Sequence, residues 1–189
     1  MVKVQIILGS TRPNRNGQAV AEWVYENAKR RPDLEVGLLD VAEFALPLLD
    51  EPLPPMAGQY TKEHTKRWAD KIAQADGYIF VTGEYNHGIP GAPKNAIDYL
   101  YAEWTNKAAG FVSYGTSGGA LAVEHLRGVM AELQIADVRA QLLLSLSTDF
   151  ETADIHRIFR PTQQHARRLQ MVIDQVVSWS AALRTIRAK

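Results

Sequence analysis

The chain has 189 residues, with 21 basic and 21 acidic side chains, a formal net charge of zero and no cysteine. A neutral chain has no overall field that attracts nucleic acid or an anionic membrane, so neither is expected as a partner. The lack of cysteine excludes disulfides, thiolate metal sites and cysteine nucleophiles, and any redox chemistry must therefore come from a bound cofactor.

Apolar runs typical of buried strands alternate with segments of helical periodicity along the chain. Strands are expected over Val2–Gly9, Glu35–Val41, Gly77–Thr82, Ala109–Tyr114 and Val138–Leu146. Helices are expected over Gln18–Arg31, around Trp68 and Ile72, over Ala92–Leu100, over 122–133 and from Leu169 to near Arg187. The segment Leu46–Gly58 is rich in proline and is expected to be irregular.

Strands that are continuous apolar runs, each followed by a helix, are typical of a parallel sheet covered on both faces. We therefore predict an α/β fold with a doubly wound five-stranded parallel sheet, and one domain over residues 1–189. The N-terminal apolar run is too short to span a membrane, so a cytoplasmic protein is expected. In such sheets ligands bind at the carboxyl ends of the strands, which directs attention to the loops that follow them.

The loop Gly9–Gly17, with the sequence GSTRPNRNG, joins the first strand to the first helix. Backbone N–H groups at a helix N-terminus, together with Arg12 and Arg15, are suited to a dianionic phosphate. The loop matches neither the G-x-G-x-x-G nor the G-x-x-x-x-G-K-[ST] pattern, which favours a monophosphate. On this loop alone, a solvated turn with two surface arginines is an equal alternative.

The loop after the third strand runs from Gly83 to Ala96 and reads GEYNHGIPGAPKNA. Its glycines and prolines give a shaped backbone whose amides are suited to reading the edge of a planar heterocycle. Tyr85 is interpreted as a wall of that site. The alternative for Tyr85 and His87 is ordinary loop packing.

The loop after the fourth strand reads YGTSGG over Tyr114–Gly119 and opens the next helix. Adjacent glycines allow a ligand to approach the backbone closely, and the helix N-terminus favours negative charge there. A glycine-rich cap without a ligand is the alternative for this loop.

Other reactive arrangements have little support in the sequence. None of the histidines has zinc-site spacing, so no metal is expected. Ser117 does not lie in a G-x-S-x-G motif, which argues against a hydrolase. Asp40, Asp50 and Glu51 are interpreted as solvated surface charges rather than as paired catalytic carboxylates.

Three segments, GSTRPNRNG, GEYNHGIPGAPKNAIDYL and VSYGTSGG, resemble in this order the motifs of the NADPH-dependent FMN reductase family. The resemblance implies a flavodoxin-like fold, bound FMN, and NADPH or NADH as co-substrate. It also implies a quinone-like, azo, metal-oxyanion or free-flavin acceptor, and a homodimer or a dimer of dimers. Gly83 and Ala92-Pro93 depart from the family pattern, and these departures bear on the choice of acceptor.

The resemblance also implies roles for individual residues. The FMN phosphate would be held by Ser10, Arg12, Arg15, Asn16, Gly17 and Gln18. The isoalloxazine ring would be lined by Glu84, Tyr85, Asn86 and His87. The pyrimidine edge or the ribityl side would meet Ser117, Gly118 and Gly119. No catalytic side chain is implied, because hydride transfer takes place at the flavin N5.

A flavodoxin-like electron carrier, or a flavin-bound redox sensor without significant NAD(P)H turnover, is the alternative function. Such carriers are often strongly acidic, and the neutral chain counts against that reading. A dimer is also favoured by a cluster of aromatic residues at Tyr99, Tyr101 and Trp104 and by the apolar residues of Leu46–Gly58. For Trp104, closing a neighbour's site and packing locally are equal alternatives.

Overall fold

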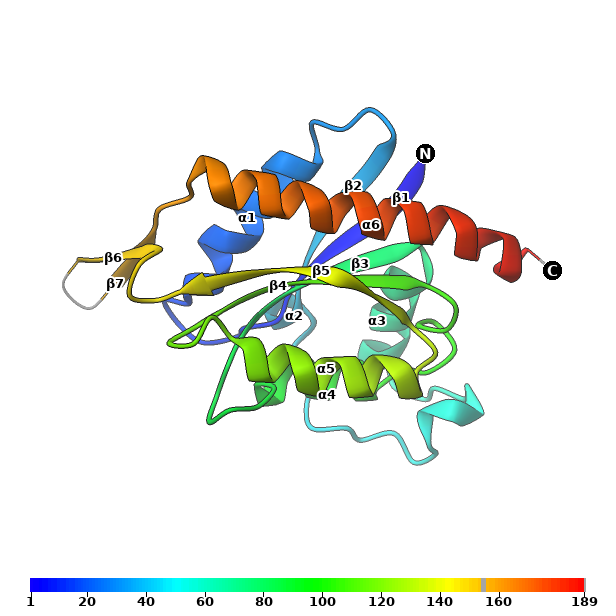
Figure 1. The fold of residues 1–189 in the computed structure, drawn as a ribbon. Coiled ribbons are helices and arrows are strands. Elements are labelled where there is room, and N and C mark those ends of the chain that lie inside the picture. The colour runs from blue at the N-terminus through cyan, green and yellow to red at the C-terminus, as the bar shows by residue number, and fades with distance from the viewer. Residues whose placement is uncertain (154–155, 189) are drawn as a thin grey trace.

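The computed structural model describes residues 1–153 and 156–188, and in this part of the chain a five-stranded parallel sheet forms the central layer (Figure 1). The strand order is β2-β1-β3-β4-β5, so the order reverses between β1 and β3. The strands are β1 (Val2–Leu8), β2 (Leu34–Asp40), β3 (Gly77–Gly83), β4 (Ala108–Gly115) and β5 (Ala136–Ser145). The predicted parallel α/β sheet is confirmed, with its strands close to their expected bounds.

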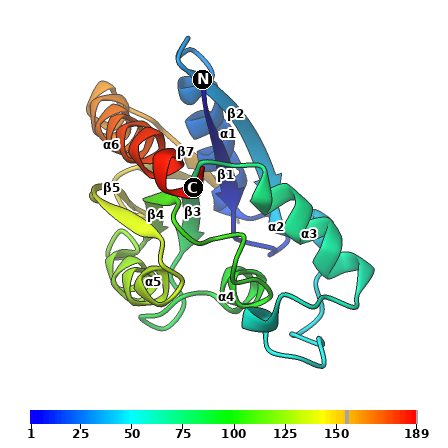
Figure 2. The ribbon, with the colours of Figure 1, turned by 90° about the vertical axis from the view of Figure 1, so that its right-hand side faces the viewer.

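Helices cover both faces of the sheet, as Figure 2 shows. One face carries α1 (Asn16–Ala28) and α6 (Gln163–Arg187). The opposite face carries α3 (Glu63–Ala73), α4 (Gly91–Asp98) and α5 (Ala120–Glu132). Every residue of β3 and of β4 is buried, which explains why these strands read as unbroken apolar runs rather than as alternating ones. No helix within 1–153 and 156–188 is both long and apolar enough to cross a bilayer.

The segment between β2 and α3 contains the single-turn helix α2 (Val41–Phe44) and a turn of 3-10 helix, η1 (Pro55–Ala57). The prediction of irregular structure over Leu46–Gly58 is therefore wrong only at η1. Proline supports η1 because it occupies the first position, where its missing N–H costs nothing.

An antiparallel hairpin of β6 (Phe150–Ala153) and β7 (His156–Phe159) was not expected from the sequence. It lies at the end of the molecule where α6 begins (Figure 1). Both strands are only four residues long, too short for a clear periodic signal. The hairpin is attached through Phe150 and Phe159, which are both buried in the core under α1 and α6.

Trp104 is completely buried in the core between the sheet and helices α3 to α5. Its indole N–H donates to the carbonyl of Ile97 at 3.1 Å, and its ring packs edge-on against Tyr78 at 4.9 Å. The local-packing interpretation of Trp104 is confirmed, and the idea that it closes a neighbour's site is wrong. Tyr99 is equally buried, so of the predicted aromatic cluster only Tyr101 keeps part of its surface exposed.

Candidate functional site

A cavity of about 350 Å³ lies at the carboxyl ends of β1, β3 and β4, beside the point where the strand order reverses. This is where doubly wound sheets bind their ligands. Three strand-end loops and the hairpin supply its walls. The lining residues are Ser10, Arg12, Asn14, Arg15, Asn16, Gly83, Glu84, Tyr85, Tyr114, Gly115, Leu146 and Arg157.

The N-terminus of α1 opens onto this cavity through Asn16. Arg15 is the residue at the cap position, and its side chain makes no capping hydrogen bond to the first turn. The first turn also contains no acidic residue. Its backbone N–H groups and the positive end of the helix dipole therefore remain available to an anion.

Arg15 lines the cavity, but its guanidinium is paired with the carboxylate of Asp40. Its Nη1 donates to Asp40 Oδ1 at 2.9 Å and to the carbonyl of Ser10 at 2.6 Å, and its Nη2 pairs with Asp40 Oδ2. The two side chains are only 13% and 17% exposed. The expectation that Asp40 is a solvated surface charge is therefore wrong. The pair joins the end of β2 to the first loop and fixes the shape of that loop.

Glu84 closes the other helix N-terminus at the site. Its Oε2 accepts hydrogen bonds from the backbone N–H groups of Leu121 at 2.9 Å and Ala122 at 3.1 Å, in the first turn of α5. The positive end of that helix thus already has an anionic partner within the chain. The N-termini of α1 and α5 consequently differ, because only α1 is left for an anionic ligand.

The loop after β3 makes a tight turn at its tip. Tyr85 and Gly88 exchange two backbone hydrogen bonds of 3.1 and 3.0 Å, and Asn86 and His87 between them have φ angles of 50° and 63°. Two left-handed residues in succession are typical of a type I′ turn. The turn places the half-exposed ring of Tyr85 on the cavity wall and leaves Asn86 and His87 exposed at the tip.

The loop after β4 is also a preset turn. Gly118 and Gly119 have φ angles of 72° and 75°, which side chains other than glycine rarely adopt. The N–H of Gly118 donates to the carbonyl of Gly115 at 3.1 Å, and the Ser113 hydroxyl donates to the carbonyl of Gly118 at 2.7 Å. At the base of this turn the Tyr114 ring lines the cavity, and burial raises the pKa of its hydroxyl.

The structure brings some of the predicted site residues together and leaves others outside the cavity. The cavity is lined by the predicted residues Ser10, Arg12, Arg15, Asn16, Glu84 and Tyr85. The predicted residues outside its lining are Gly17, Gln18, Asn86, His87, Ser117, Gly118 and Gly119. The lining residues not predicted as ligands are Asn14, Gly83, Tyr114, Gly115, Leu146 and Arg157. Arg157 had no signal in the sequence, because it comes from the unexpected hairpin.

The donors around the cavity suit a phosphate monoester. The open N-terminus of α1, the nearly buried Ser10 and the cations Arg12 and Arg157 all lie on its walls. A phosphate dianion accepts hydrogen bonds from such groups and needs opposite charge nearby. FMN therefore fits these residues at its phosphate end. Among the residues that the structure describes, no cluster of acidic and histidine side chains is arranged to hold a metal ion.

Comparison with known proteins also points to FMN as the cofactor. A sequence profile described as NADPH-dependent FMN reductase matches residues 2–149. An NAD(P)H-dependent FMN reductase of Nectria sp is 45% identical over 163 residues, which is 81% of each chain. A Schizosaccharomyces pombe protein of the same description is 40% identical over 149 residues, covering 78% of this chain and 74% of that one. Other similar proteins are named FMN-dependent NADPH-azoreductase and quinone reductase.

Among solved structures, the flavoenzyme FerB of Paracoccus denitrificans, an NAD(P)H:(acceptor) oxidoreductase, superposes with a TM-score of 0.75. It is 25% identical in sequence, and the alignment covers 96% of this chain and 98% of FerB. An archaeal flavodoxin superposes with a TM-score of 0.62 at 11% identity, which shows the fold alone. The flavodoxin-like fold implied by the sequence motifs is therefore confirmed.

Proposed function

The chain belongs to the NADPH-dependent FMN reductase family, and we propose that it passes reducing equivalents from NAD(P)H through bound FMN to a small-molecule acceptor. The observation that carries this proposal is the uncapped N-terminus of α1 at a cavity between strand ends. The chemistry that FMN supplies when bound is hydride acceptance from NAD(P)H and release of two electrons to an acceptor. The acceptors that we consider are quinone-like, azo, metal-oxyanion and free-flavin compounds.

The chain's own part in this reaction is to bind and orient. The first turn of α1, Ser10 and Arg12 would hold the phosphate, while the Arg15–Asp40 pair keeps the first loop in shape. For the ring we propose the turns after β3 and β4, which bear the remaining predicted contacts. Glu84 links these two loops, because it starts in one and binds the helix that follows the other.

The proposal is tested by the absorption spectrum of the purified protein and by mass analysis of what heating releases. We expect a flavin spectrum and one FMN per chain. Mixing the loaded protein with NADPH under nitrogen should then bleach the flavin rapidly. Recovery of FAD, or no flavin after reconstitution, contradicts the cofactor. Loading without bleaching would instead favour the electron carrier.

We further propose a homodimer, supported by the strap, which we define as residues 46–62. The strap exposes large apolar side chains, with Leu48 85% and Met56 66% exposed and Leu49 and Leu53 partly so. Clustered exposed apolar side chains usually mark a binding surface. The buried aromatic residues Tyr99 and Trp104 no longer support this proposal.

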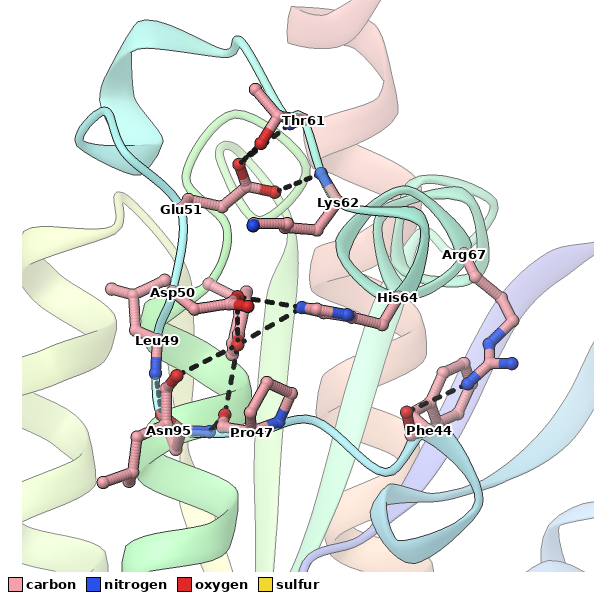
Figure 3. Close-up of polar contacts among 12 residues, drawn as sticks. Phe44, Pro47, Leu49, Asp50, Glu51, Thr61, Lys62, His64, Arg67 and Asn95 are labelled. Carbon is pink, nitrogen blue, oxygen red and sulfur yellow. Dashed lines mark hydrogen bonds and ion pairs between the residues drawn. The ribbon is translucent and has the colours of Figure 1, made fainter.

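The strap is held in place by several polar contacts, which Figure 3 shows. The side chain of Asn95 accepts from the N–H of Leu49 at 3.0 Å and donates to the carbonyl of Pro47 at 2.7 Å. His64 Nε2 lies 2.9 Å from Asp50 Oδ1. A segment pinned in this way presents its apolar side chains at a small additional cost in entropy, which favours association.

Glu51 holds the far end of the strap. It accepts from the backbone N–H groups of Thr61 at 2.8 Å and Lys62 at 3.0 Å (Figure 3). Desolvation acts in the opposite direction, but these hydrogen bonds lower the pKa of Glu51 to about 2. The strap therefore keeps this anchor ionised throughout the neutral range.

A further inference from the structure

The cavity has one wall that lies beyond the family match. The match ends at residue 149, and hairpin β6–β7 begins at Phe150 and contributes Arg157 to the cavity. We propose that Arg157 is a further FMN-binding residue, which contacts the phosphate together with the N-terminus of α1. This inference rests on the proposed function, since it takes FMN as the ligand.

The hairpin is anchored to the elements that would hold the phosphate. Phe150 and Phe159 are opposite each other in the hairpin, and both are buried. Phe159 packs edge-on against Trp23 of α1, with ring centroids 5.4 Å apart, and Phe150 packs against Tyr114 at 6.4 Å. The hairpin therefore has a fixed position relative to α1 and to the end of β4.

Alternation along β7 directs Arg157 toward the cavity. Residues two apart in a strand share a face, so Arg157 lies on the same face as the buried Phe159. Ile158, between them, is on the opposite face and is partly exposed to solvent. Arg157 is thus placed on the inner face of the hairpin, consistent with its position in the cavity wall.

One hydrogen bond positions the guanidinium of Arg157 and leaves its other N–H donors for a ligand. Its Nη1 donates to the carbonyl of Leu146 at 2.6 Å, and the N–H of Leu146 donates to the carbonyl of Gly115 at 3.0 Å. This chain of hydrogen bonds ties Arg157 to the ends of β5 and β4. A guanidinium has several N–H donors. In the described part of the chain, the Leu146 carbonyl is the one acceptor that bonds the guanidinium of Arg157. The remaining donors are available to a ligand.

The positive charges on the cavity walls favour an anionic ligand. Asp40 neutralises Arg15, and Glu84 is bound to the first turn of α5. Within residues 1–153 and 156–188, no carboxylate forms an ion pair with Arg12 or with Arg157. Arg12 and Arg157 together carry two positive charges, which match the charge of a phosphate dianion.

The test compares two flavins that differ only in the phosphate. Flavin-stripped protein is titrated with FMN and with riboflavin, and the quenching of flavin fluorescence gives each Kd. The variants are Arg157→Gln and Arg157→Lys. The matched control is Arg160→Gln, because Arg160 lies just beyond β7, pairs with Glu151 and is outside the cavity lining.

We expect Arg157→Gln to raise the Kd for FMN by about tenfold to a hundredfold, because a charge-assisted hydrogen bond is lost. The Kd for riboflavin should stay the same, which also shows that the variant is folded. Arg157→Lys should recover part of the FMN affinity, since it restores the charge without the planar donors. Arg160→Gln should change neither Kd.

Three results would overturn the assignment. An equal loss of FMN and riboflavin affinity would mean that Arg157 supports the fold or the ring site. An unchanged Kd for FMN with a raised KM for NADPH would mean that Arg157 contacts the nicotinamide cofactor instead. A wild-type protein that binds neither flavin would contradict the proposed function itself, and the inference would fall with it.

Discussion

The carboxylate of Glu84, at the end of β3, accepts a 2.9 Å hydrogen bond from the backbone N–H of Leu121, in the first turn of α5. The contact spans 37 positions of the chain and joins two of the three loops at the cavity. Glu84 thus acts as a cap for a helix that follows a different strand. Its role in the structure is to connect the loop after β3 to the first turn of α5. This role does not depend on any contact with the flavin ring.

The first prediction concerns this cap. Glu84→Ala should lower the free energy of unfolding by about 1 to 2 kcal/mol, because two helix N–H groups lose their acceptor and the helix dipole loses its charge. Glu84→Gln should restore part of the loss through its remaining oxygen. Urea unfolding measures both variants. Glu132→Ala, at the exposed end of the same helix, is the control, and equal effects at the two positions would contradict the capping role.

The second prediction is that Arg12 affects the affinity for FMN more than the rate of flavin reduction. Arg12→Ala should raise the Kd for FMN by about tenfold to a hundredfold, because a charge at the phosphate is lost. The rate of flavin reduction in the fully loaded protein should change less than the Kd. Fluorescence titration and stopped-flow absorbance give the two numbers. An unchanged Kd with a collapsed rate would show that Arg12 lies at the reacting end of the flavin.

Much of the fold is predictable because the strands and helices leave strong local patterns. Strands β3 and β4 are buried on both faces, and their continuous apolar runs have few other interpretations. The hairpin is held by Phe150 and Phe159, whose partners Tyr114 and Trp23 lie far away in the sequence. No local pattern records such contacts, so the hairpin and Arg157 could not be predicted.

The site was predictable only in part, for a similar reason. Loop composition indicated where a phosphate would bind, but not how the charges on the loop are paired. The sequence predicts that Arg15 binds the phosphate, whereas in the structure its guanidinium binds Asp40, which is 25 positions away. Whether Arg15 also contacts the phosphate stays a prediction, as do the ring contacts and the cytoplasmic location.

The third prediction uses the buried Lys107, which lies directly before β4. Its Nζ donates to the carbonyls of Ile72 and Ala73 at 2.8 and 3.0 Å, and burial, with Arg187 nearby, lowers its pKa from 10.5 to about 8. Between pH 8 and 10.5 the unfolded chain therefore binds more protons at this residue than the folded one. The stability of the protein should rise with pH in that window through Lys107.

Lys107→Met removes this titration and supplies the comparison. The difference in unfolding free energy between wild type and variant should shift in favour of wild type by about 1 to 2 kcal/mol between pH 7.5 and 9.5. Urea unfolding at the two pH values measures it. A difference that stays constant with pH would show that the pKa of Lys107 is not lowered in the folded protein.

The fourth prediction tests the proposed dimer by replacing an exposed methionine with glutamate, once in the strap and once in α6. Met56 of the strap is 66% exposed and Met171 of α6 is 52% exposed. Met56→Glu should shift the protein to monomer, because a buried charge at an interface is costly. Met171→Glu should leave the dimer unchanged. Sedimentation velocity at micromolar concentration distinguishes the species, and a wild-type monomer with full FMN content and activity would contradict the proposal.

The last prediction compares glycine-to-alanine changes in two helices. At Gly128, in the middle of α5, an added Cβ meets no atom within 4 Å. Gly128→Ala should therefore stabilise the protein by about 0.5 to 1 kcal/mol, since alanine restricts the unfolded chain more than glycine does. Thermal unfolding measures the change, and destabilisation would show that the surroundings of α5 are tighter than the structure indicates.

At Gly17, in the first turn of α1, the same change should have the opposite sign. An added Cβ would lie 2.6 Å from the hydroxyl oxygen of Tyr114 and 3.1 Å from Leu8 Cδ1, so the buried Tyr114 ring must move. We expect Gly17→Ala to destabilise the protein by about 1 to 3 kcal/mol, as overpacking does. Because Tyr114 lines the cavity, FMN affinity should fall as well. Stability and FMN affinity equal to those of wild type would show that the Tyr114 contact does not require glycine at position 17.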